Sequence, residues 1–157
     1  KLKGFNDMQP YQIKCGFTSG VDVTKYAQPV YTWKQMQYLR WGLENGLDIV
    51  SYNTIKFSAY QMHLIYKGEL VGLKVHNYAE PELSWSDMKV AMENEIYTLC
   101  RLYNLDAEQS TELFMAIESG HHINNFLDHG YSGEEMRLIR LKLNKEKADQ
   151  ITNNEIS

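Results

Sequence analysis

The sequence has few cysteines and no long hydrophobic run. Its two cysteines, Cys15 and Cys100, lie far apart with no second thiol near either, which argues against a disulfide framework and a zinc knuckle. No run approaches the roughly 18 apolar residues of a membrane-spanning helix. The formal net charge is only -4, so nothing in the overall charge favours nucleic acid or an anionic membrane. A chain of 157 residues fits one domain, and its cysteine usage predicts a cytoplasmic location.

Catalytic motifs are also missing from the sequence. It contains no serine nucleophile elbow, no His-Glu-x-x-His pair and no phosphate-binding glycine loop. Glycine pairs such as Gly16 and Gly20 occur in segments with charged residues, so they do not indicate a membrane dimer. We expect the first glycine of each pair to let neighbouring helices approach closely. We predict a protein that is not an enzyme, has no cofactor and acts on no small-molecule substrate.

The sequence does contain an internal repeat of about 26 residues, present in six copies. Each copy has a residue suited to cap a helix, followed three positions later by an acid or an amide. This pair forms a capping box, whose two side chains satisfy free backbone N–H groups at the helix start. An apolar residue precedes each cap, and in four copies a methionine in the first helical turn completes a hydrophobic staple. The caps are Asn6, Thr32, Ser58, Ser84, Asp106 and Ser132, and their partners are Gln9, Gln35, Gln61, Asp87, Gln109 and Glu135.

Each cap is predicted to begin one long helix. Apolar residues recur four, seven and eleven positions after the cap, and Phe17 is the last of them in the first copy. In four copies a glycine follows, as expected at a left-handed helix end. The connectors, such as residues 21–31, are predicted as one- or two-turn helices that proline ends in two copies. The fourth copy is predicted as one longer helix through Leu102.

These patterns predict an all-α fold. Long and short helices alternate in six copies, with helix starts near residues 6, 32, 58, 84, 106 and 132. Stacking buries faces that no single copy can bury, so a small solenoid or a compact helical bundle is expected. Residues 1–149 are predicted as a single domain and residues 150–157 as a frayed tail.

Aromatic residues exceed what the apolar stripe can hold, with 11 tyrosines and 3 tryptophans in the chain. Some of them are expected to pack between copies, because each helix of a repeat protein touches two neighbours. The remainder are anchors of the type enriched at protein interfaces. The predicted partner-binding residues are Tyr38, Trp41, Tyr60, Tyr66, Trp85 and Tyr97.

Two other groups of residues give alternative predictions. The segment IESGHHINNFLDHG holds His121, His122 and His129, which would suit a metal-dependent enzyme, but their spacing matches no known closed site. The last helix is basic and would suit the phosphates of nucleic acid, although acidic residues are interleaved with it. Solvated surface residues are the simpler interpretation of both groups, and we assign no metal ligand. The basic set consists of Arg137, Arg140, Lys142 and Lys145.

The stretch WKQMQYLRWGLENGLDIVSY and the connector KYAQPVYTWKQM resemble short helical repeats in proteins of phages and mobile elements of gut Firmicutes. The likeness covers most of residues 6–144, and the matched positions are caps, staples and core. It therefore implies a fold and a genomic setting, and it carries no catalytic residue. Proteins in that setting often disarm host defence. The resemblance thus implies an inhibitor of the anti-CRISPR type, whose partner would be a protein or nucleoprotein such as a CRISPR nuclease complex.

Overall fold

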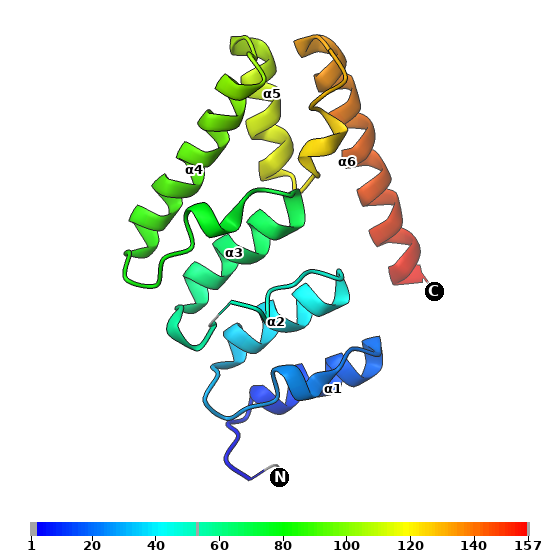
Figure 1. Cartoon of the computed structure of the whole chain (residues 1–157). Coiled ribbons are helices and arrows are strands. Elements are labelled where there is room, and N and C mark those ends of the chain that lie inside the picture. Colours follow the sequence, from blue (N-terminus) through cyan, green and yellow to red (C-terminus); the bar gives the residue numbers. More distant parts are fainter. Residues whose placement is uncertain (1–2, 53, 157) are drawn as a thin grey trace. The chain divides into compact units, whose positions relative to one another are not determined.

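The computed structural model describes residues 3–52 and 54–156, and all the regular secondary structure in these residues is helical (Figure 1). The all-α prediction is confirmed, as are the one-turn helices in the connectors and the long fourth helix. The long helices are α1 (Gln9–Ser19), α2 (Trp33–Glu44), α3 (Ala59–Val71), α4 (Trp85–Leu102), α5 (Ala107–Glu118) and α6 (Gly133–Ile156). Four single turns of 3-10 helix lie in the connectors: η1 (Val23–Lys25), η2 (Thr54–Lys56), η3 (Val75–Asn77) and η4 (Ile123–Asn125).

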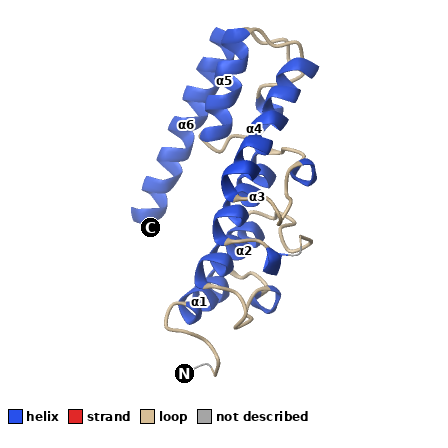
Figure 2. Cartoon of the chain, turned by 90° about the vertical axis from the view of Figure 1, so that its left-hand side faces the viewer, coloured by secondary structure: helices blue, strands red, loops and turns tan. Residues whose placement is uncertain are grey.

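The chain divides into two compact units, a division that the sequence did not predict. The first unit consists of Lys1–Leu70 and Lys74–Met92, and the second of Val71–Leu73 and Glu93–Ser157. In the first unit α1 packs against α2, and in the second α5 packs against α6. Figure 2 shows α1, α2 and α3 side by side, with the connectors of that unit along one side of them.

Five of the six long helices begin directly after their predicted caps, whereas α1 begins at Gln9, with Met8 and not Asn6 at its N-cap. Thr32 Oγ1 accepts a hydrogen bond from the Gln35 N–H at 3.2 Å, and Gln35 Oε1 accepts one from the Thr32 N–H at 2.7 Å. The same pair of bonds occurs at four of the other caps. At Ser84 the partner Asp87 instead accepts from the serine hydroxyl. The four staple methionines, Met36, Met62, Met88 and Met136, are buried.

The capping glutamines also bridge neighbouring copies. While Gln35 Oε1 accepts from its own cap, Gln35 Nε2 donates to the carbonyl of Phe57 at 2.8 Å, just before the next cap. One primary amide thus satisfies a backbone donor of one copy and a backbone acceptor of the next. A carboxylate has no proton to donate, so Asp87 and Glu135 cannot form this bridge. Equivalent bonds join Gln9 to Tyr31, Gln61 to Leu83 at 2.8 Å, and Gln109 to Tyr131 at 2.7 Å.

The first glycine of each pair makes room for a side chain of the connector that follows. The sequence had predicted instead that these glycines let two long helices approach closely, and that prediction is wrong. The Tyr78 hydroxyl donates to the Leu64 carbonyl at 3.0 Å, and a Cβ on Gly68 would lie 1.8 Å from that hydroxyl oxygen. Gly16 accommodates Tyr26 in the same way. In the fifth copy the equivalent positions hold Ala116 and Phe126, both buried. In that copy the helix carries the alanine methyl group in place of glycine, and the connector carries a phenylalanine, which lacks the tyrosine hydroxyl.

Glycines also end the helices as predicted. Gly20 follows α1 with φ 76° and donates its N–H to the Phe17 carbonyl at 3.2 Å. Left-handed backbone of this kind costs glycine little, which explains its place after the long helices. The other three predicted glycines, Gly46, Gly72 and Gly120, also have positive φ.

Two further details of the predicted helices are wrong. Phe17 was placed on the buried stripe, yet its side chain is 69% exposed. The buried face of α1 is centred on Gln12, Ile13 and Gly16, and Phe17 lies about a quarter turn away from the middle of that face. The expected frayed tail is helical as far as Ile156. That segment has no glycine or proline to end α6, and its Gln150 and Glu155 favour helix.

Gly68→Ala is expected to lower the free energy of unfolding by about 2 kcal/mol, because the added methyl clashes with the buried Tyr78 hydroxyl. Adding Tyr78→Phe removes the hydroxyl and reproduces the Ala116 and Phe126 combination. The double variant should therefore regain part of the lost stability. Urea unfolding of both single variants and the double variant gives the coupling free energy. If the two losses simply add, the proposed pairing of glycine with hydroxyl is incorrect.

Candidate protein-binding surface

Four ring-bearing side chains of α2 and α3 lie together in the first unit, and we name them the aromatic cluster: Tyr38, Trp41, His63 and Tyr66. The Tyr38 ring meets the Trp41 ring edge to face, with 5.5 Å between their centroids. The Tyr66 centroid lies 5.9 Å from Trp41 and 6.2 Å from Tyr38, and the His63 ring lies 5.5 Å from Tyr38. Such separations are favourable for aromatic pairs. The cluster is a preformed, partly apolar surface feature.

Helix periodicity explains how the aromatic cluster forms. Tyr38 and Trp41 are three residues apart on α2, and His63 and Tyr66 are three residues apart on α3, so each pair shares one face. His63 is exposed, and the other three side chains are half-buried. Burial raises the pKa of both tyrosine hydroxyls above the ordinary value. Both therefore remain protonated at neutral pH and can donate a hydrogen bond to a partner.

The contact between Tyr38 and Tyr66 belongs to a recurring register between neighbouring helices. It joins the sixth position after one cap to the eighth position after the next. The same two positions hold Gln12 and Arg40 in α1 and α2, where Arg40 Nε donates to Gln12 Oε1 at 3.2 Å. The same two helical positions are thus occupied by a polar pair between α1 and α2 and by an aromatic pair between α2 and α3.

A second group lies at the starts of α2, α3 and α4 in the first unit, along one edge in Figure 1. Lys34 Nζ lies 5.6 Å from the Trp33 ring centroid and 5.7 Å from that of Tyr60. The Tyr60 ring lies 6.4 Å from Trp85, and Lys89 Nζ lies 5.8 Å from the Trp85 ring. Tyr60 is 65% exposed and Trp85 44%. We name these five residues the aromatic–lysine array.

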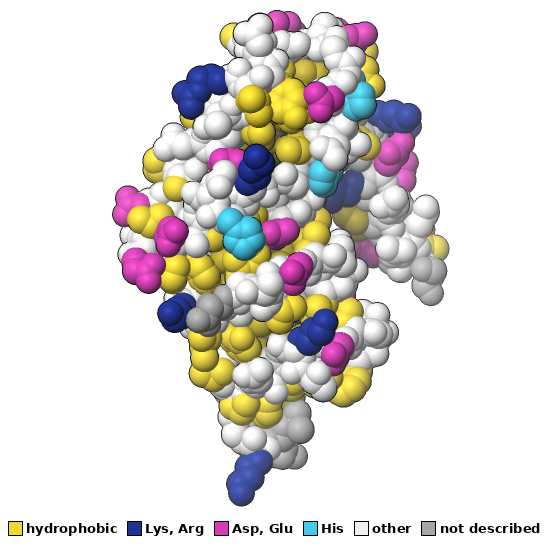
Figure 3. All heavy atoms as spheres, in the orientation of Figure 1, with side chains coloured by type: hydrophobic (Ala, Val, Ile, Leu, Met, Phe, Trp, Pro, Cys, Tyr) yellow, Lys and Arg dark blue, Asp and Glu magenta, His cyan; other side chains and the backbone are white. Residues whose placement is uncertain are grey.

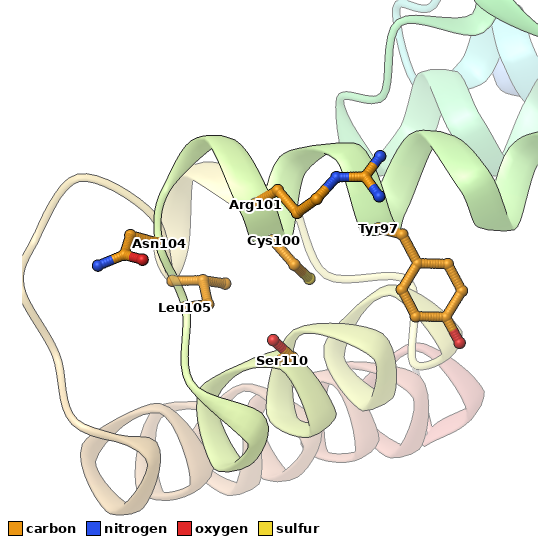
Figure 4. Close-up of a pocket in the computed structure, with 6 residues that line it drawn as sticks. All are labelled: Tyr97, Cys100, Arg101, Asn104, Leu105 and Ser110. Atoms are coloured by element: carbon orange, nitrogen blue, oxygen red, sulfur yellow. The ribbon is translucent and has the colours of Figure 1, made fainter.

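Tyr97, the sixth predicted anchor, belongs to the second unit. Its side chain is 53% exposed and its ring lies 4.9 Å from that of Phe114. Tyr97 also lines a pocket of about 360 Å³ between the end of α4 and the start of α5 (Figure 4). Among the residues that the structure describes, no histidine or carboxylate lines this pocket that could act as a base for Cys100. The lining residues are Tyr97, Cys100, Arg101, Asn104, Leu105 and Ser110.

The structure divides the predicted basic set. Arg140 is buried, and its Nε lies 2.7 Å from Glu112 Oε2 in the register just described. Its guanidinium is therefore not available to a phosphate, which corrects its assignment to a nucleic-acid surface. Lys142 and Lys145 are exposed, as is Arg137. Figure 3 shows basic and acidic side chains interspersed over the face in view.

The three histidines do not assemble into a metal site. His121 is buried and bonds Asn144 Oδ1 at 2.6 Å through its Nε2. His122 Nδ1 accepts from the Asn124 N–H at 3.2 Å, and His129 Nε2 lies 2.8 Å from the Asn124 carbonyl oxygen. Among the residues that the structure describes, no group of three or more histidine, cysteine, aspartate or glutamate side chains is placed to hold a metal ion.

The sequence predicted most of the aromatic residues but missed the basic ones beside them. His63, Lys34 and Lys89 had no place in the predicted surface, and Trp33 was not selected. The missed signal is positional. Lys34 and Tyr60 each stand two residues after a cap, so neighbouring copies bring them together.

Comparison with known proteins gives no relative for this chain: no family model, no curated protein and no solved structure matches it. In the part of the chain that the structure covers, no helix has both the length and the apolar character needed to cross a membrane.

Arg140→Ala is expected to lower the free energy of unfolding by about 3 kcal/mol, because it leaves Glu112 buried without its partner. Arg137→Ala is the matched control. Its pair with Glu134 is exposed, so its stability should change by no more than about 0.5 kcal/mol. Urea unfolding measures both values. Equal stability of the two variants would show that the buried pair does not contribute as the geometry indicates.

Proposed function

We propose that this protein is a non-catalytic, α-helical repeat protein that binds a protein partner through its aromatic cluster. The observation that carries the proposal is the contact of Tyr38, Trp41 and Tyr66 on one half-exposed surface. Aromatic side chains of this kind supply large contact areas at little cost in conformational entropy, and tyrosine and tryptophan dominate binding energy at interfaces. His63 adds a polar ring at the margin.

The repeat architecture is part of the proposal. The recurring amide bridges and the recurring register between helices support copies stacked as a small solenoid within each unit. Such a scaffold holds side chains of neighbouring copies in fixed relation. It therefore offers a partner a surface that needs little ordering on binding.

The identity of the partner is a narrower proposal that rests on the resemblance of the sequence to repeats of phages and mobile elements. We propose a nuclease of an RNA-guided defence system as the partner, with the protein acting as an inhibitor in the cytoplasm. The two free thiols, Cys15 and Cys100, agree with a reducing compartment.

Replacing Tyr38 and Trp41 together by alanine is expected to reduce partner capture by about tenfold or more, because interface aromatics account for most binding energy. The test is a pull-down with tagged protein from a bacterial lysate that contains a CRISPR system. The lysate is used with and without nuclease treatment, and the captured proteins are identified by mass spectrometry. Phe17→Ala is the control, since that ring is exposed on α1 outside the aromatic cluster. Circular dichroism shows whether each variant is folded.

The expected result is a protein partner that survives nuclease treatment and is lost only with the Tyr38 and Trp41 variant. Equal capture by wild type and that variant would contradict the proposal. Recovery of nucleic acid alone, lost at higher salt, would favour the exposed cations of α6 instead.

A further inference from the structure

The aromatic–lysine array contains two lysines for which the described residues supply no ion-pair partner. Lys34 and Lys89 are both exposed, and within the described ranges 3–52 and 54–156 neither forms an ion pair. Asp87, a carboxylate in the first turn of α4, accepts instead from the Ser84 hydroxyl at 2.7 Å. Neither ammonium group is therefore bound to a carboxylate of the described residues, and each remains available to an anion from outside the chain.

The rings hold these cations in place. Lys34 Nζ lies almost equally far from the Trp33 and Tyr60 rings, so the lysine stem spans from α2 to α3. Lys89 Nζ lies over one ring, that of Trp85 in the same helix. A cation near an aromatic face is attracted to it, and an ammonium held in this manner loses less freedom when it binds an anion. The array is preorganised for negatively charged groups set beside apolar ones.

The chemistry favours an acidic peptide over a nucleic acid. Base stacking requires free ring faces, and here the lysines approach the faces of Trp33, Tyr60 and Trp85. Nucleic-acid binding also draws on many phosphate contacts, whereas this array has two cations in a chain of net charge -4. Two carboxylates with apolar neighbours match two ammonium groups flanked by exposed rings.

We propose that the first unit binds an acidic segment of a partner protein, whose carboxylates meet Lys34 and Lys89 while its apolar side chains contact Tyr60 and Trp85. This inference rests on the proposed function and specifies the chemistry of the partner segment that a second group of residues in the same unit, the aromatic–lysine array, binds.

The test is fluorescence anisotropy with a labelled synthetic peptide that alternates Glu and Asp with Leu and Phe. A second peptide carries Gln and Asn in place of the acids, and an oligothymidine is the third probe. The protein variants are Lys34→Gln with Lys89→Gln, and a control pair, Lys56→Gln with Lys74→Gln. The control lysines are exposed in the connectors of the same unit, so both pairs change the net charge equally.

Wild type should bind the acidic peptide and not its amide counterpart. The Lys34 and Lys89 pair should weaken that binding by about tenfold, as expected for two partly exposed ion pairs, and the control pair should leave it unchanged. Three results would overturn the proposal: no binding of the acidic peptide, equal losses in both lysine pairs, or tighter binding of oligothymidine that depends on Lys34 and Lys89.

The same lysine variants also separate this inference from the proposed function. If the captured partner is lost with the Tyr38 and Trp41 variant but retained with the Lys34 and Lys89 variant, the acidic segment is excluded and the aromatic surface stands. If neither variant loses the partner, the proposed function itself fails.

Discussion

The side-chain amide of a capping glutamine forms hydrogen bonds to two neighbouring copies at once and so links them. Gln35 accepts from the start of its own helix and donates to the carbonyl just before the next one. Both backbone groups would otherwise need another partner, and an unpaired buried group costs free energy comparable to a lost hydrogen bond. Only glutamine supplies the reach, the acceptor and the donor together. Glu135 completes the cap at Ser132, but a carboxylate cannot donate, so neither Glu135 nor Asp87 can form the bridge.

The bridges join neighbouring helices in a register that brings particular side chains together at the surface. The same two helical positions meet in three pairs of neighbouring copies, the third pair being Glu112 and Arg140. That contact is a polar pair at Gln12 and Arg40 and an aromatic pair at Tyr38 and Tyr66. In both cases the helices meet in the same register, so exchanging two side chains changes the chemistry of this contact. This is the physical reason why the proposed function rests on single residues while the fold rests on the repeated ones.

Local features of the fold were predictable from the sequence because their causes are local. Caps, staples and C-terminal glycines act within one turn of the helix that they begin or end, and apart from the N-cap of α1 they were found where their residues stand. Contacts between copies depend on a register that no single copy reveals. The burial of Arg140 against Glu112 is such a contact, 28 residues apart in sequence, and it was predicted as part of an open basic surface. The role of Lys34 beside Tyr60 was missed for the same reason.

The central claim, that capping glutamines bridge the copies, is tested most directly by NMR hydrogen exchange of the side-chain amides. The Nε2 protons of the four bridging glutamines, Gln9, Gln35, Gln61 and Gln109, should exchange with solvent far more slowly than those of the exposed Gln28 and Gln150. Exchange of all six amides at the same fast rate would contradict the bridges and the register that depends on them.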